Sequence, residues 1–123
     1  MAWWNYLSLQ SIVDTIAFPR RRTLVIDASV TFTLTLTENY DLILINNVTV
    51  ANDFILTLPL SATAGQGRQI KVKDNTGSCA ANSTITVQRA GADTIDGGAG
   101  YLMNTAYAYI TLAADGVTRW GRQ

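Results

Sequence analysis

The sequence predicts an all-β protein with a short helical extension at its N-terminus. Two observations predict this class: apolar and polar residues alternate in several short runs after residue 23, and turn-forming residues separate these runs. Alternation with a period of two is typical of half-buried strands, and closely spaced short strands are typical of sandwiches and barrels. We therefore expect a compact antiparallel β-sandwich or barrel-like module over residues 23–123, preceded by a separate segment over residues 1–22.

The clearest strand pattern covers residues 30–37, where apolar residues and threonines alternate without a break. Val30, Phe32, Leu34 and Leu36 share one face, and the four threonines share the other. A slip of one residue would turn the threonines into the core, so this register is strongly specified.

Later runs follow the same pattern and supply the rest of the expected core. Their inward residues are Phe54, Leu56, Leu58, Leu60, Ile70, Val72, Ile85, Val87, Ile110 and Leu112. Lys71, Lys73, Tyr109 and Thr111 alternate with them and face outward. Pro59 indicates an edge position or a strand end. The continuous apolar run over residues 42–45 is instead typical of a strand that is covered on both faces.

Turn signals lie between the runs. Clusters of glycine, asparagine and aspartate provide the positive φ angles that tight turns need, and they occupy residues 46–47, 64–67, 74–77, 91–93, 96–98 and 115–116. Asp93 and Asp96 allow two interpretations, a calcium loop or a tight turn with Ile95 pointing inward, and we favour the turn. The sequence contains no repeat strict enough to indicate a solenoid.

The first 22 residues have a different character. Residues 5–18 carry apolar side chains at helical spacing, namely Leu9, Ile12, Val13, Ile16 and Ala17. Pro19 ends any helix near residue 18, because the residue before a proline disfavours the α conformation.

Large aromatic and basic residues flank this helical pattern, and a segment so short has too little core of its own to bury them. They are Trp3, Trp4, Tyr6, Arg20, Arg21 and Arg22. We expect the three aromatic residues to insert into a partner protein or a symmetry mate; docking back onto the chain's own β-domain is the alternative. For the arginines we expect a charge pair with an acidic surface of the partner, with contact to nucleic acid as the alternative.

The composition argues against an enzyme. The chain has no histidine, the commonest general base and metal ligand, and its carboxylates are scattered beside turns. Its single cysteine, Cys79, lies among small residues and is expected to be a small, semi-buried apolar side chain. We therefore expect no catalytic residues, no metal and no cofactor.

Charge and hydropathy also limit the expected partners. The net charge is zero, so no overall field attracts nucleic acid or an anionic membrane. No apolar run approaches the roughly 18 residues of a membrane span, and the start lacks a secretory signal pattern. Only 15% of the residues are charged, which suits a chain that covers much of its surface with copies of itself.

The second half of the chain carries an ordered set of short motifs. They are Leu58-Pro59, residues 65–74, Gly77, residues 84–87, residues 93–97, residues 108–112, Asp115-Gly116 and Trp120. Their order and spacing resemble a β-module that recurs in bacteriophage fibre, tail and head-decoration proteins, over about residues 40–120. The resemblance implies a homotrimer on the virion surface and no catalytic residues.

The short N-terminal region favours a capsid decoration, cement or head-fibre protein attached to a phage capsid through residues 1–22. The alternative is a short tail-fibre or baseplate protein whose β-domain binds a host receptor or glycan. Four aromatic residues are candidates for stacking on sugars or for packing between the copies of a trimer: Tyr101, Tyr107, Tyr109 and Trp120. Their alternation with core residues favours packing. A small glycan hydrolase is the most distant hypothesis.

Overall fold

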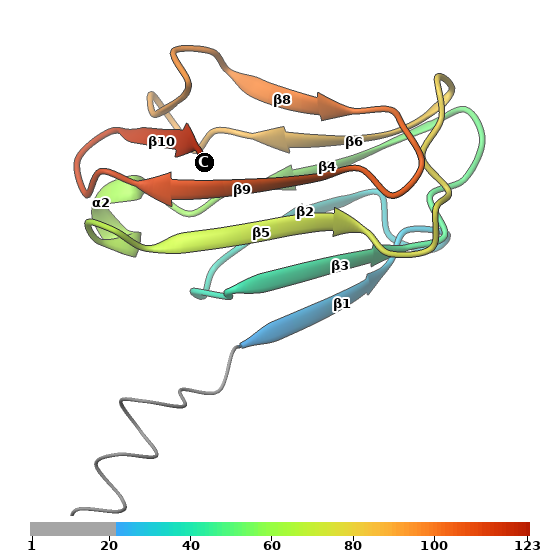
Figure 1. Ribbon diagram of the computed structural model, residues 1–123, viewed down its shortest axis with the longest axis horizontal. Helices are drawn as coiled ribbons and strands as arrows, with labels where there is room; N and C mark the ends of the chain where they lie inside the picture. Colours follow the sequence, from blue (N-terminus) through green and yellow to red (C-terminus); the bar gives the residue numbers. More distant parts are fainter. Residues whose placement is uncertain (1–21) are drawn as a thin grey trace, which may run out of the picture.

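The computed structural model describes residues 22–123 (Figure 1). Within these residues, ten strands and one short helix follow each other: β1 (Thr23–Asp27), β2 (Thr33–Thr35), β3 (Leu42–Asn46), β4 (Asn52–Thr57), α2 (Ser61–Ala64), β5 (Gln69–Asp74), β6 (Ser83–Gln88), β7 (Thr94–Ile95), β8 (Gly100–Met103), β9 (Tyr109–Ala114) and β10 (Arg119–Arg122). The predicted β-rich character is confirmed. The expected helix over residues 5–18, with Trp3, Trp4, Tyr6, Arg20 and Arg21, lies outside the described residues.

The strands form two sheets, one with the order β1-β3-β5-β9-β10-β7 and the other with the order β2-β4-β6-β8. Figure 1 shows β1, β3, β5 and β9 in one layer, with β2 and β4 behind them. The first six strands alternate between the sheets, so the chain winds around a shared core.

This winding makes the first six strands parallel to their neighbours within each sheet, through the pairs β1–β3, β3–β5, β2–β4 and β4–β6. The short β7 also runs parallel to β10, and among the strands that the structure describes only β5–β9, β9–β10 and β6–β8 are antiparallel. The expectation of an antiparallel module was therefore wrong for most pairs. Side chains alternate in the same way whichever direction the neighbouring strand takes.

The core lies between the two sheets and consists of the inward residues of each strand. Ile70, Val72, Ile85, Val87, Ile110 and Leu112 are all buried, as the alternation predicts. Phe54, Leu56 and Leu58 are buried too, and Pro59 follows the end of β4 as expected. Leu60 is 46% exposed because the strand has already ended, so its expected place in the core was wrong.

Two other predicted strands differ in detail. The pattern over residues 30–37 forms only the three-residue strand β2, and Val30 is 74% exposed. Phe32 is also exposed, whereas Leu36 is buried as predicted. In β3, Ile43 and Ile45 are buried while Leu42 and Leu44 are half-buried, so this strand is not fully covered on both faces.

Most of the predicted turns have the expected backbone. Asn47, Gly65, Gly67, Gly77, Gly91, Asp96, Gly97 and Gly116 all have positive φ angles. Ile95 points into the core, and Cys79 is a buried free thiol, both as predicted. Within residues 22–123, no helix has the length and apolarity that crossing a membrane requires.

Candidate functional site

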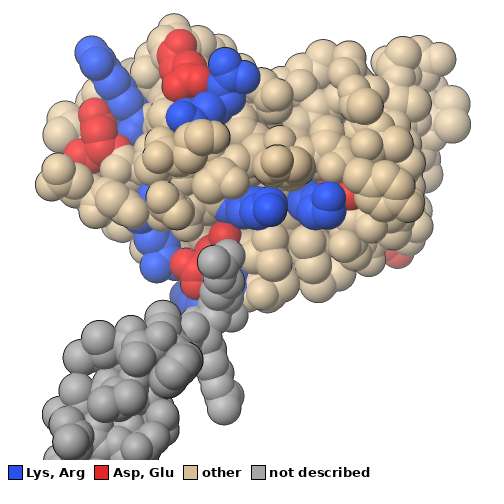
Figure 2. Space-filling model, viewed as in Figure 1, with Lys and Arg blue, Asp and Glu red and all other residues tan. Residues whose placement is uncertain are grey.

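Aromatic and basic side chains gather on the outer face of the six-stranded sheet. Because Ile70, Val72, Ile110 and Leu112 point inward, their neighbours on β5 and β9 point outward. Lys73 pairs in register with Tyr109, and Lys71 with Thr111. We call Lys71, Lys73, Tyr107 and Tyr109 the tyrosine–cation surface. Figure 2 shows basic side chains near the middle of this face, with mostly uncharged residues to their right and further basic and acidic side chains to their left.

The lysines lie against the exposed tyrosine rings. The Nζ atom of Lys71 is 4.6 Å from the centroid of the Tyr109 ring, and Lys73 Nζ is 5.7 Å from the centroids of both Tyr107 and Tyr109. Tyr107 and Tyr109 are 58% and 59% exposed. A cation over an aromatic ring is attracted by the ring quadrupole, so these contacts order the rings while leaving much of their area open.

A buried carboxylate positions Tyr107. Asp74, at the end of β5, is fully buried and accepts hydrogen bonds from the backbone N–H groups of Ser78 (3.2 Å), Cys79 (3.0 Å) and Tyr107 (3.0 Å). Tyr107 has a φ angle of 62°, and its ring lies over Gly77, where an added Cβ would be 2.5 Å from Cζ of the ring. Asp74 thus joins two loops whose close contact sets the place of the ring.

Beside this surface lies a polar groove of about 340 Å³, lined by Tyr101, Tyr109, Thr111, Asp96, Arg122 and Gln123. The guanidinium carbon of Arg122 is 5.1 Å from the centroid of the half-buried Tyr101 ring. Arg122 Nε donates to Asp96 Oδ2 at 2.6 Å, and this hydrogen bond lowers the pKa of Asp96 below its usual value. The groove therefore combines two aromatic rings with fixed charged and polar groups.

The arrangement suits binding. Rings with open faces stack on flat apolar surfaces, and hydroxyl, amide and guanidinium groups make directional hydrogen bonds. The surface and the groove together contain three cations, Lys71, Lys73 and Arg122, and the groove contains one carboxylate, Asp96, which pairs with Arg122. Such a surface fits a second copy of a protein or a saccharide, and an anionic saccharide most closely.

Trp120 does not belong to this surface. It is 0% exposed, and its indole Nε1 donates to the backbone oxygen of Pro59 at 3.2 Å. The expectation that Trp120 stacks on a sugar or on another copy is therefore wrong. Its side chain points inward while Arg119 and Gly121, its neighbours on β10, are on the other face.

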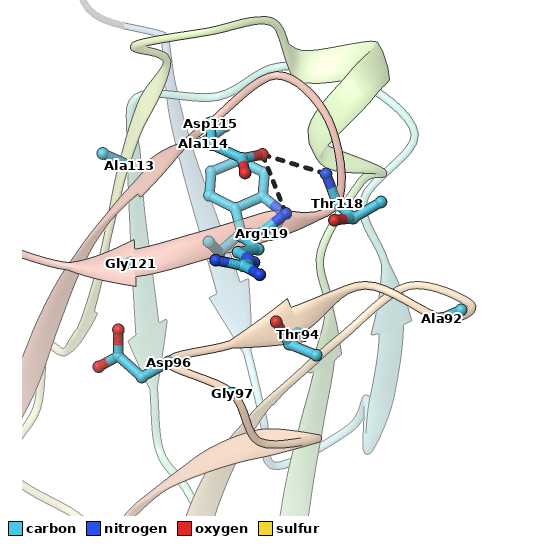
Figure 3. A pocket seen from close by; sticks show the side chains of 11 residues that line it. Ala92, Thr94, Asp96, Gly97, Ala113, Ala114, Asp115, Thr118, Arg119 and Gly121 are labelled. Carbon is cyan, nitrogen blue, oxygen red and sulfur yellow. Dashed lines mark hydrogen bonds between the residues drawn. The ribbon is translucent and has the colours of Figure 1, made fainter.

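A larger hollow of about 840 Å³ lies next to the turn between β9 and β10 (Figure 3). Asp115 accepts hydrogen bonds from the backbone N–H groups of Val117 (2.8 Å), Thr118 (3.0 Å) and Arg119 (3.0 Å). These bonds lower the pKa of the Asp115 carboxyl. Its lone pairs are thus used to hold the turn, and we assign no chemistry to this hollow.

The other residues weighed for chemistry also have structural contacts. Asp93 is buried and accepts the backbone N–H of Ser61 at 2.7 Å, while Asp96 pairs with Arg122. No group of three or more cysteine and acidic side chains within residues 22–123 is placed to hold a metal ion. Burial and the neighbouring Asp74 raise the pKa of Cys79 to about 12, so its thiol is protonated at neutral pH.

Arg22 is the one expected anchoring residue that the structure describes. Its guanidinium pairs with Glu38 at 2.5 Å and donates to the backbone oxygen of Asn39 at 3.2 Å. Its backbone N–H donates to Asp41 at 2.9 Å. Arg22 therefore pairs with an acidic group of its own domain while its side chain stays about half exposed (53%), and its expected contact with a partner stays a prediction.

Sequence reasoning missed the contribution of Lys71, Lys73, Arg122 and Asp96 to this site. The alternation correctly predicts that both lysines point outward, yet it contains no information on which strand lies beside β5. The pairing of β5 with β9 brings lysines and tyrosines together, although about 35 residues separate them in the sequence.

The chain matches no protein-family model, and no curated protein matches it significantly.

Proposed function

We propose that this chain is a non-enzymatic structural protein of a bacteriophage virion. In this proposal it is a homotrimeric capsid decoration, cement or head-fibre protein, displayed on the virion surface and attached through residues 1–22. Its β-domain is a two-sheet, sandwich-like module, and its partners are two further copies of itself and a phage capsid or tail protein.

The observation that carries the proposal is the place of the motif residues in the fold. Leu58, Trp120 and the alternating residues of β5, β6 and β9 fill the core, and Asp74 and Asp115 hold turns through backbone N–H groups. Motifs made of core and turn residues are expected for a module whose task is to build a stable surface.

The tyrosine–cation surface supports self-association. Tyr107 and Tyr109 are more than half exposed, and the ammonium groups of Lys71 and Lys73 lie over their rings. Tyrosine and other aromatic residues are enriched in protein interfaces, because they bury a large area at a small cost in conformational entropy. The low charge content of the chain points in the same direction.

A second candidate function rests on the groove between Tyr101 and Tyr109. A volume of about 340 Å³ is within the range of small-ligand sites, and its rings and polar groups suit a saccharide. The chain would then be a short tail-fibre or baseplate protein that binds a host receptor or glycan.

Particle binding tests the first proposal. The double variant Trp3→Ala/Trp4→Ala and the control Leu102→Ala, which changes an exposed residue of β8, are mixed with particles of the parent phage that lack the protein. We expect the double variant to remain a trimer, at about three times the 13.3 kDa of one chain, and to lose particle binding. Equal incorporation of the double variant and the control would contradict attachment through this segment.

Tyr109→Ala separates the two functions. Under the trimer proposal it lowers the mass measured by light scattering, because the variant removes an interface anchor. Under the glycan alternative the mass is unchanged, while binding on an array of neutral and acidic oligosaccharides is lost.

A further inference from the structure

Two depressions adjoin along β10. The hollow of about 840 Å³ beside the turn between β9 and β10 and the groove of about 340 Å³ share Asp96 in their linings. Gly121 lines the hollow, and a Cβ added there would lie 3.8 Å from Asp96 Oδ1 and 4.0 Å from Nε2 of Gln123, which lines the groove. Gly121 therefore lies where the two depressions meet, and we call them together the β10 trough.

The alternation of side chains explains why the trough is continuous at this point. Trp120 is buried, so Gly121 beside it is on the outer face of the sheet. Gly121 pairs in register with Ala113 of β9, and Figure 3 shows the two residues on neighbouring strands. A glycine opposite an alanine leaves this part of the sheet without a large side chain, so a ligand can lie close to the backbone.

An arginine lies at the hollow end of the trough. Arg119 pairs in register with Thr94 of β7, and both residues line the hollow (Figure 3). Three other arginines form the ion pairs within residues 22–123, so Arg119 has no carboxylate partner there. Its guanidinium is therefore able to present a planar fork of N–H donors to a carboxylate or sulfate group of a ligand.

Aromatic rings and a fixed ion pair lie at the groove end. Tyr101 and Tyr109 line the groove, and Tyr109 is 59% exposed. Arg122 Nε donates to Asp96 Oδ2 at 2.6 Å, so both charged groups are held in place before a ligand arrives. Sugar hydroxyls donate to carboxylates and accept from guanidinium groups, and the apolar face of a sugar ring packs on an aromatic ring.

The length and lining of the trough suit a chain of sugars. Residues 119–123 are extended and span about 13 Å, which exceeds one sugar ring. The lining consists mainly of hydroxyl, amide, charged and aromatic groups with small apolar residues, and its one larger aliphatic side chain, Ile110, is buried. Such a lining favours a hydroxyl-rich chain over a protein partner, whose apolar anchors need pockets to fill.

We propose that the β10 trough binds an acidic oligosaccharide that lies across Gly121, with a carboxylate or sulfate group on Arg119 and a sugar ring on Tyr109. The inference rests on the glycan-binding function given above as the second candidate, and it extends that site from the groove into the hollow. It adds two properties that the groove alone does not require: affinity that rises with the length of the sugar chain, and a preference for acidic chains.

Calorimetric titration with sugars of different length and charge tests these properties. The probes are the mono-, di- and tetrasaccharides of galacturonic acid, of sulfated galactose and of glucose. We expect an acidic tetrasaccharide to bind roughly tenfold or more tightly than its monosaccharide, because it occupies both parts of the trough. We also expect it to bind more tightly than the neutral tetrasaccharide.

The outcomes separate this inference from the function on which it rests. If no probe binds the unaltered protein, the glycan-binding function and the inference are both wrong. If mono- and tetrasaccharides bind equally, the groove remains a saccharide site and only the extended trough is wrong.

Gly121→Leu tests whether the two depressions act as one site. Gly121 has no positive φ angle, and an added Cβ makes only ordinary contacts, so we expect the variant to fold. Leucine fills the middle of the trough, and we expect it to weaken tetrasaccharide binding by roughly tenfold to a hundredfold while monosaccharide binding is unchanged. The control Ala62→Leu, at an exposed position of α2, leaves both unchanged.

Unchanged tetrasaccharide affinity in a folded Gly121→Leu variant would overturn the proposal. So would a loss of oligomer mass in light scattering for this variant, which would assign the trough to a second copy of the chain.

Arg119→Gln tests the acidic end. We expect it to weaken binding of the acidic tetrasaccharide by roughly tenfold to a hundredfold, as for the loss of a hydrogen bond to a charged group, and to leave the neutral one nearly unchanged. Arg89→Gln is the matched control, because Arg89 lines neither the hollow nor the groove. Equal effects of Arg119→Gln on acidic and neutral chains would contradict the contact with an acidic group.

Discussion

The carboxylate of Asp74 accepts a hydrogen bond from the backbone N–H of Tyr107 at 3.0 Å, across 33 residues of sequence. The same carboxylate binds two N–H groups of the loop after β5, including that of Cys79. It therefore ties this loop to the one before β9, and Tyr107 lies over Gly77 as a result. A buried structural residue thus determines where an exposed aromatic ring is presented.

Asp74→Asn tests this role. The amide keeps the size of the side chain but replaces an acceptor with a donor that faces N–H groups. We expect the free energy of unfolding to fall by about 2–4 kcal/mol, because buried donors lose their partner. Urea unfolding measures the loss. Asp53→Asn, which affects an exposed carboxylate bonded to the hydroxyls of Thr84 and Thr86, is the control, and we expect it to cost less than about 1 kcal/mol. Equal losses would contradict the bridging role.

The contact between Gly77 and Tyr107 predicts that substitutions at these two positions have coupled effects on the free energy of unfolding. Gly77→Ala adds a Cβ 2.5 Å from the Tyr107 ring at a φ angle of 72°, whereas Gly67→Ala adds one in open space at a φ angle of 81°. Both variants are strained by the positive φ, which costs about 1 kcal/mol. We expect Gly77→Ala to lower the free energy of unfolding by about 1–3 kcal/mol more than Gly67→Ala does, because of the clash.

A double-mutant cycle isolates that clash. Tyr107→Ala removes the ring, so we expect Gly77→Ala to cost no more than Gly67→Ala when both are made in the Tyr107→Ala background. If Gly77→Ala remains the more costly of the two there, the ring does not cause the difference.

Asp115 predicts a loss of stability in acid. Backbone N–H groups lower its pKa below the usual 3.8, so the folded state favours the ionised form. Its contribution is present above pH 3.8 and is lost as the pH falls through the lowered pKa. We expect Asp115→Asn to be less stable than the unaltered protein at neutral pH, with the two converging in acid. A difference that does not change with pH would show that the charge of Asp115 is not what holds the turn.

Cys79 predicts a change at the other end of the pH scale. Burial and Asp74 raise its pKa from 9.0 to about 12, so the thiolate forms first in the unfolded chain. The contribution of the protonated thiol to stability is complete below pH 9.0 and declines as the pH rises towards about 12.

The variant Cys79→Ala is therefore expected to lose less stability over that alkaline range than the unaltered protein. At neutral pH the native thiol is expected to react with a disulfide reagent much more slowly than the thiol of the urea-unfolded chain. Rapid modification of the native protein would contradict this burial.

Much of the local structure could be predicted from the sequence. The alternation around Val72, Ile85 and Ile110 assigned the correct residues to the core, because a strand presents successive side chains to opposite faces. The glycine and asparagine clusters marked turns for a similarly local reason, since few other residues adopt positive φ angles at low cost. Ile95 and Cys79 were correctly placed inside.

Other features could not be predicted, because they depend on neighbours distant in the sequence. Successive turns of the winding contain different numbers of residues: Leu42 pairs with Thr23 in the strand before it and with Lys71 in the strand after it, and these two residues are unequally distant from Leu42 in the sequence. No regular repeat is therefore visible. The perfect alternation of residues 30–37 predicted a long half-buried strand, yet β2 is an edge strand and Val30 is exposed. Whether Trp120 faces the core or the surface depends on how β10 lies against β9, which its own sequence does not specify.

The tyrosines show which features depend on the local sequence and which depend on the tertiary fold. The outward direction of Tyr109 could be predicted from its own strand, because the residues beside it are apolar and the period is two. The contact of Lys71 and Lys73 with its ring, the positioning of Tyr107 by Asp74 and the burial of Trp120 all depend on how the strands pair. The outward direction of a side chain is a local property of its strand, whereas its neighbours are determined by the order and direction in which the strands pair.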